Sequence, residues 1–137
     1  MKKSVTEIHL GERRHPSLFL NKAEIEQIRA LVADGTTYQH RYWGEMQIRS
    51  ERWLKDPLAI PERGGDGSLV YWCPDDGRML TYDPASPHDH VCPKCGKSHQ
   101  GDKLDGTWRA FTHLSIAFTV RELGILYAVE GDYRYAT

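Results

Sequence analysis

The chain of 137 residues has little of several features that would define a function class at once. No stretch approaches the roughly 18 consecutive apolar residues of a membrane-spanning helix, so we expect no membrane partner. Its 18 lysines and arginines nearly balance 19 aspartates and glutamates, which leaves a net charge of −1 and no general attraction for nucleic acid. The common nucleotide-binding, serine-hydrolase and zinc-protease motifs do not occur.

Cysteine is also scarce, and there is no secretion signal. The first residues include two lysines but no apolar stretch behind them. Three cysteines, an odd number in a short chain, make a poor disulfide framework. Both observations favour a cytoplasmic protein with reduced cysteines. Hydrophobic residues make up 39% of the chain, enough for one modest core, which excludes a wholly disordered protein.

Helical patterns flank a cysteine-rich segment and predict a mainly α fold. Asn21 and Glu24 have the spacing of a capping box and begin a helix predicted over residues 22–34. A second helix is predicted over about residues 37–55, because apolar side chains recur at helical spacing until Pro57 stops the pattern. The intervening cysteine-rich segment shows no helical periodicity.

The third predicted helix, over residues 107–129, is the most apolar part of the chain. Its apolar positions cover well over half of the helix circumference, so it needs packing partners on several sides. Asp105 can cap its start and Gly131 can end it. Residues 133–136 look like the first turn of another helix. Because a single helical turn is not stable alone, we expect that the chain is truncated.

Two short motifs predict a metal site. Residues 92–96 read C-P-K-C-G, a knuckle in which two thiolates face one ion while the glycine permits the tight turn. Residues 73–77 read C-P-D-D-G, the same pattern with aspartate in place of the second cysteine. Two knuckles about 20 residues apart form a zinc ribbon. The sequence therefore predicts a structural zinc ion bound by Cys73, Cys92 and Cys95.

The fourth zinc ligand stays open at this point. His90 precedes Cys92 by two residues, so in an extended segment both side chains share a face, and we favour it first. Asp76 has the place of the missing cysteine, although carboxylates are less common in closed structural zinc sites. His88 and His99 are further alternatives. A redox C-x-x-C pair is the competing interpretation, but such pairs occur between a strand and a helix rather than in a loop rich in proline and glycine.

Five segments follow one another in an order that is itself informative. Residues 15–20 read H-P-S-L-F-L, and residues 71–74 and 87–96 enclose the cysteine-rich segment. Residues 108–113 contain tryptophan, arginine and histidine at helical spacing, and residues 127–136 read Y-A-V-E-G-D-Y-R-Y-A. In this combination the chain resembles the N-terminal portion of heparinase II/III-like polysaccharide lyases.

The resemblance implies the start of an incomplete (α/α) toroid with a small zinc-ribbon-like β insertion. It divides the chain into an irregular lead-in (1–20), a helical region (21–68), the insertion (69–100) and the first toroid helix with the start of the next (101–137). For the whole protein it implies β-elimination on a uronic-acid-containing polysaccharide, with an acidic polysaccharide or oligosaccharide as partner. None of the family's catalytic residues matches a position here, so we expect this chain to be inactive without a missing C-terminal part.

His113, Trp108 and Arg109 are the candidates for contact with a sugar. A histidine or tryptophan within a helix is more often part of a packed core, which weakens this assignment. Two other function classes stay open: a small structural-zinc binding module and a non-catalytic helical scaffold. Nucleic acid is a poor partner for such a module here, because residues 69–100 carry three basic side chains against four acidic ones.

Overall fold

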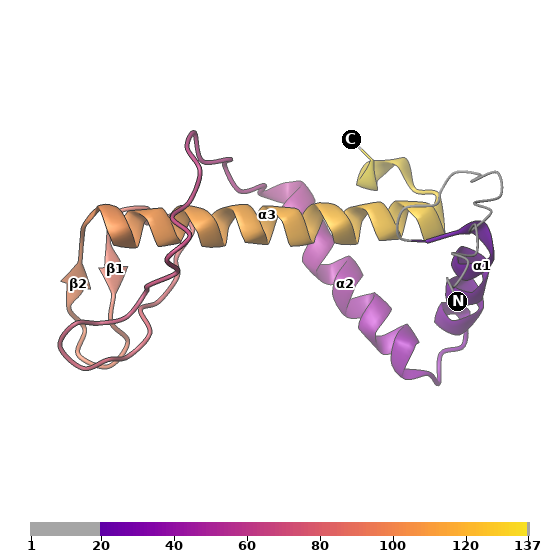
Figure 1. The fold of residues 1–137 in the computed structure, drawn as a ribbon. Helices are drawn as coiled ribbons and strands as arrows, with labels where there is room; N and C mark the ends of the chain where they lie inside the picture. The colour runs from indigo at the N-terminus through magenta and orange to yellow at the C-terminus, as the bar shows by residue number, and fades with distance from the viewer. Residues whose placement is uncertain (1–19, 137) are drawn as a thin grey trace, which may run out of the picture.

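A computed structural model describes residues 20–136 as an elongated, mainly helical molecule (Figure 1). The long helix α3 is its axis, with a small sheet at one end and the helices α1 and α2 towards the other. The elements in chain order are α1 (Lys22–Ala33), α2 (Tyr38–Lys55), β1 (His90–Val91), β2 (Ser98–His99), α3 (Asp102–Glu130) and the 3₁₀ turn η1 (Tyr133–Tyr135).

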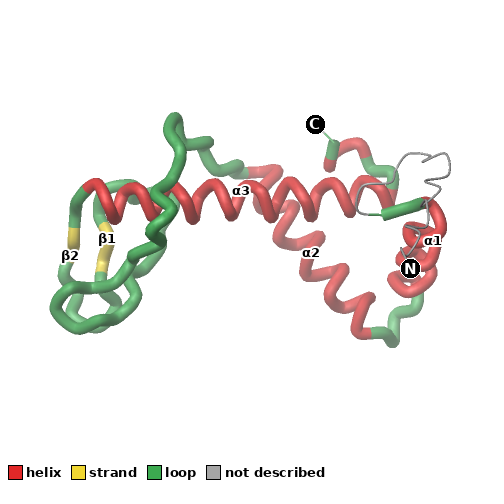
Figure 2. The backbone as a smooth tube through the Cα atoms, viewed as in Figure 1, coloured by secondary structure: helices red, strands yellow, loops and turns green. Residues whose placement is uncertain are grey.

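The prediction of a mainly α fold is confirmed, but the three helices described within residues 20–136 do not by themselves show the predicted start of an (α/α) toroid. Most of the segment between α2 and β1 is loop, as Figure 2 shows. The second toroid helix expected after Gly131 is represented by the short turn η1. The predicted lead-in at 1–20, apart from its last residue, and most of the motif at 15–20 lie outside the described residues.

The predicted capping box at the start of α1 is confirmed. The side-chain Oδ1 of Asn21 accepts a hydrogen bond from the Glu24 backbone N–H (3.0 Å), and Glu24 Oε2 accepts one from the Asn21 backbone N–H (2.7 Å). Two backbone donors that the helix leaves unpaired are thereby satisfied. Helix α2 begins similarly, because the Thr37 hydroxyl accepts from the backbone N–H of His40 (3.0 Å).

Two separate hydrophobic clusters form on α3, one near each end. Trp108 belongs to the cluster at the N-terminal end and Leu126 to the one at the C-terminal end, about 27 Å away at 1.5 Å per helical residue. Between them, Leu114 and Phe118 are 46% and 54% exposed. Despite this apolar character, no helix within residues 20–136 is long and apolar enough to cross a membrane.

The C-terminal end of α3 is held by side chains from α1 and α2. The Arg29 guanidinium donates to the carbonyl oxygens of Val129 (2.6 Å) and Ala128 (3.2 Å), which lie in the last helical turn and lack helical partners. The Trp43 indole N–H donates to a carboxylate oxygen of Glu130 (2.7 Å). Gly131, with φ of +75°, ends the helix as predicted, because glycine adopts this left-handed conformation without strain.

The predicted start of α3 is wrong. The helix begins at Asp102, after Gly101, and not at residue 107 after a capping Asp105. Asp105 lies within the first turns of the helix, where its carboxylate binds two histidine side chains instead of backbone N–H groups. A favourable capping residue therefore serves a tertiary contact that the local sequence does not reveal.

The loop after α2 crosses α3 at very short range. The Asp66 backbone N–H donates to the Gly106 carbonyl oxygen (2.9 Å), although that carbonyl lies within a helix. A Cβ atom on Gly106 would lie 2.6 Å from the Asp66 Cβ, and one on Gly65 would lie 2.4 Å from the Ala110 Cα. Glycine at 65 and 106 is therefore a steric requirement of the crossing.

We expect Gly106→Ala to destabilise the protein by about 1–3 kcal/mol, because the added methyl group forces the loop away from α3. Gly124→Ala is the matched control in the same helix, since a Cβ there meets nothing within 4 Å. The control should instead stabilise by about 0.5–1 kcal/mol through helix propensity. Urea unfolding measures both, and equal effects of the two substitutions would contradict the close crossing.

Candidate metal centre

The two knuckles fold into the same backbone turn. In each, the cysteine N–H bonds to the carbonyl five residues later, and the glycine N–H bonds back to the cysteine carbonyl. Both glycines have positive φ, +66° at Gly77 and +71° at Gly96. The hydrogen bonds are Cys73 N to Arg78 O (2.7 Å), Gly77 N to Cys73 O (2.9 Å), Cys92 N to Lys97 O (2.9 Å) and Gly96 N to Cys92 O (2.9 Å).

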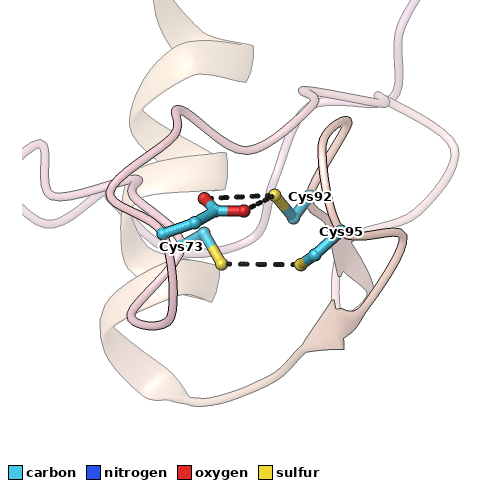
Figure 3. Close-up of side chains that lie close together, drawn as sticks. Cys73, Cys92 and Cys95 are labelled. Atoms are coloured by element: carbon cyan, nitrogen blue, oxygen red, sulfur yellow. Dashed lines mark hydrogen bonds between the residues drawn. The ribbon is translucent and has the colours of Figure 1, made fainter.

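Because the turns match, Asp76 occupies in the first knuckle the place that Cys95 has in the second. The side chains of both knuckles converge on one point (Figure 3). Ligand atoms of Cys73, Asp76, Cys92 and Cys95 all lie within 4.8 Å of one another. The Sγ atoms of Cys73 and Cys95 are 3.8 Å apart, and Cys92 Sγ lies 3.6 and 3.4 Å from the two Asp76 carboxylate oxygens. This group can hold a metal ion.

The pKa values of two of the cysteines are shifted in opposite directions. Burial raises the pKa of the Cys73 thiol to about 11, although backbone N–H groups of Asp75 and Asp76 act in the opposite direction. Burial also disfavours the Cys92 thiolate, but hydrogen bonds from the backbone N–H groups of Cys95 and Lys94 outweigh it, so the pKa of Cys92 is lowered. N–H groups directed at sulfur suit thiolates, the form in which cysteine binds metals.

Asp76 is prepared to act as an anion. Its Oδ1 accepts a hydrogen bond from the Arg78 backbone N–H (3.0 Å), and this bond is the main reason why the pKa of the Asp76 carboxyl lies below its usual value. The carboxylate is therefore ionised at neutral pH. Among the fourth-ligand alternatives, Asp76 is the one that the structure groups with all three cysteines.

His90, the favoured fourth ligand from sequence, does not join this group. It is completely buried, and both of its ring nitrogens have partners: Nδ1 is 2.7 Å from the Tyr71 hydroxyl and Nε2 is 2.9 Å from Asp105 Oδ1. Burial raises the pKa of Tyr71 to about 12, so the phenol stays protonated and donates to Nδ1, while Nε2–H donates to the carboxylate. Both ring nitrogens are therefore engaged, and His90, contrary to the expectation, is not grouped with the three cysteines.

His88 joins the same hydrogen-bonded network from the solvent side. Its Nδ1 lies 2.5 Å from Asp105 Oδ2, and its side chain is 71% exposed. Burial acts to raise the pKa of Asp105, but hydrogen bonds from His90 and His88 outweigh it and lower the pKa. The chain of contacts from Tyr71 to His88 thus ties the knuckle segment to the first turns of α3.

The other open alternative, His99, lies close to one of the cysteines. Strand β2 pairs antiparallel with β1, with His99 opposite His90. Its Nε2 is 3.3 Å from Cys73 Sγ. With Asp75, Cys73 and Cys95 it forms a second group whose ligand atoms lie within 4.8 Å of one another.

Each of the three sugar-contact candidates has a hydrogen-bond partner in the structure. Trp108 is only 8% exposed, and its indole N–H donates to the Asp83 carbonyl oxygen (2.7 Å), so it is a core residue in this structure. Arg109 Nε donates to the Gly64 carbonyl oxygen (3.1 Å), and His113 Nε2 lies 3.1 Å from the Arg63 carbonyl oxygen. The last two side chains hold the loop that crosses α3.

Comparison with family models, with curated proteins and with solved structures gave no match.

Sequence reasoning missed the contribution of Asp105 and Tyr71 to the knuckle segment. No local sequence pattern indicates these contacts, because Tyr71 lies 19 positions and Asp105 lies 15 positions from their common partner His90. The repeated C-P-x-x-G pattern, in contrast, was sufficient to place Asp76 opposite Cys95. The position of Asp76 in this repeat agrees with its place beside the three cysteines in the structure.

Asp105→Ala should destabilise the protein by about 1–3 kcal/mol, because it leaves the buried His90 Nε2–H without a partner. Asp102→Ala removes an exposed carboxylate one helical turn earlier and should change stability by less than about 0.5 kcal/mol. Thermal unfolding at constant zinc concentration compares the two. Equal stability of both variants would show that the network does not anchor the segment.

Proposed function

We propose that the paired knuckles bind one zinc ion tightly through Cys73, Asp76, Cys92 and Cys95. The matching backbone turns carry this proposal, since each presents one buried cysteine and one further ligand to the same point. Zinc prefers four-coordinate tetrahedral sites with thiolate, imidazole or carboxylate ligands.

The spacing of the ligand atoms agrees with this geometry. Tetrahedral zinc with Zn–S bonds of about 2.3 Å requires sulfur atoms about 3.8 Å apart, and a carboxylate oxygen at about 2.1 Å requires a sulfur–oxygen separation of about 3.6 Å. The observed separations are 3.8 Å between Cys73 and Cys95 and 3.4–3.6 Å between Cys92 and Asp76. Four protein ligands leave no open position, so the role is structural rather than catalytic.

Bound zinc stabilises the cysteine-rich segment at the N-terminal end of α3. Apart from the two-residue strands β1 and β2 and an isolated bridge between Trp72 and Met79, the segment between residues 69 and 100 has little regular hydrogen bonding. Its hydrophobic cluster includes two of the ligating cysteines. Zinc binding therefore supplies folding free energy that so small a core lacks.

Protein purified without added metal should retain about one equivalent of zinc, measured by elemental analysis after removal of any tag. Asp76→Ala should weaken zinc binding at least tenfold, because loss of a group that supports a metal site commonly lowers metal affinity by about ten- to a hundredfold. Asp89→Ala is the control, because that nearby carboxylate binds Ser98 and Gln100 rather than the cluster. No zinc in the folded wild type, or equal zinc affinity in both variants, contradicts the assigned ligand set.

We further propose that this chain is the N-terminal portion of a heparinase II/III-like polysaccharide lyase, which acts by β-elimination on an acidic polysaccharide. The ordered motifs of the sequence are the basis of this proposal. One structural observation favours it over a self-sufficient zinc module: Leu114, Phe118 and Val120 on α3 are 46%, 54% and 62% exposed, as expected for a helix that packs against further helices.

The 137-residue chain should release no unsaturated uronate from heparan sulfate or alginate, because none of its residues match the family's proton-abstracting base or its carboxylate-neutralising group. The protein encoded by the complete reading frame should release it. Ultraviolet absorbance of the unsaturated product measures both. Activity of the short chain would contradict the absence of catalytic residues, and inactivity of the complete protein on all uronate polymers would favour a scaffold or zinc module.

A further inference from the structure

We infer that the cluster has room for a second divalent ion, bound by Asp75 and His99 and bridged to the first through the thiolates of Cys73 and Cys95. This inference rests on the proposed zinc site and extends it to a binuclear, thiolate-bridged centre. The ions that suit such ligands are thiophilic, with zinc, cadmium and cobalt(II) as the chemical class.

The observation behind it is the overlap of two four-residue groups. One consists of Cys73, Asp76, Cys92 and Cys95, and the other of Cys73, Asp75, Cys95 and His99. They share the pair Cys73 and Cys95, and the other two ligands of each group differ. A thiolate has enough lone pairs to bridge two metals, so the shared pair can complete both sets at once.

The separations of ligand atoms in the second group are close to those of a metal site. The shared sulfur atoms are 3.8 Å apart and His99 Nε2 is 3.3 Å from Cys73 Sγ. Zinc ligands with Zn–S of about 2.3 Å and Zn–N of about 2.0 Å are about 3.5 Å apart in a tetrahedron. Small side-chain shifts therefore suffice to seat an ion.

The two groups differ in their access to solvent. Of the ligands that the groups do not share, Cys92 is buried and Asp76 half-buried in the first group, whereas Asp75 is exposed and His99 half-buried in the second. The Asp75 side chain is 48% exposed and binds Lys97 Nζ through Oδ2 (2.7 Å), while its Oδ1 has no hydrogen bond within the described part of the chain. The second ion can thus enter directly from water and leave again. It should bind more weakly than the first.

Charge favours the second ion as well. Three thiolates and the Asp76 carboxylate carry more negative charge than one divalent cation neutralises, and Asp75 adds to this excess. Lys97 lies next to Asp75 and offsets only part of it. A second divalent cation between Asp75 and the shared thiolates reduces the remaining repulsion.

The experiment is a zinc titration of the intact chain, followed by native mass spectrometry and elemental analysis. The wild type should bind one equivalent tightly and a second at higher free zinc, and the second should be removed first by a chelator. His99→Ala should bind one equivalent only. His40→Ala is the control for ordinary histidine–zinc contacts, since His40 lies on α2 and its Nδ1 contacts the Val32 carbonyl oxygen.

Asp75→Asn provides an independent variant, because it alters an exposed side chain and should not disturb folding. It should weaken the second equivalent at least tenfold and leave the first unchanged. With cadmium-113 in place of zinc, the wild type should give two resonances coupled through the shared sulfurs, and His99→Ala a single one.

The outcomes separate the two proposals. Two equivalents in the wild type and one in His99→Ala support the binuclear centre. One equivalent at every zinc concentration overturns it and leaves the single structural site intact. Two equivalents in His99→Ala place the second ion elsewhere and also overturn it. No bound zinc in the folded wild type overturns both proposals.

Discussion

The architecture depends on one long helix that serves two cores without bringing them together. Trp108 near the N-terminal end of α3 and Leu126 near the C-terminal end belong to different hydrophobic clusters. Each cluster contains few fully buried side chains, so hydrophobic burial at either end is limited. Stability at each end must therefore come partly from other interactions, and the two ends use different ones.

At the C-terminal end, polar side chains complete the helix terminus. Arg29 donates to carbonyl oxygens of the last turn, and Glu130 accepts from both Trp43 and Gln47. These contacts join α1 and α2 to α3 and satisfy groups that every helix end leaves unpaired. The fold at this end follows ordinary rules of helix capping and packing and needs no ligand.

At the N-terminal end of α3, the connecting segment is mostly loop, and two kinds of interaction stabilise it. The buried network from Tyr71 through His90 to Asp105 supplies one. The proposed zinc centre supplies the other by joining two knuckles that are distant in sequence. Both ring nitrogens of His90 have hydrogen-bond partners in this network, and His90 lies outside the groups of residues that could hold a metal ion. Binding of a second ion at the exposed side would leave this anchoring unchanged.

Local sequence by itself determined much of the helical end and the outline of the metal centre. The capping box at Asn21, the Gly131 stop and the two C-P-x-x-G knuckles depend on interactions within about five residues, and such interactions can be read from spacing. Tertiary structure alone decided the roles of Asp105, Trp108 and His90. Their partners lie 15 to 25 positions away in the chain. Only the fold determines whether a carboxylate caps a helix or holds an imidazole, because both uses satisfy the same hydrogen-bonding need.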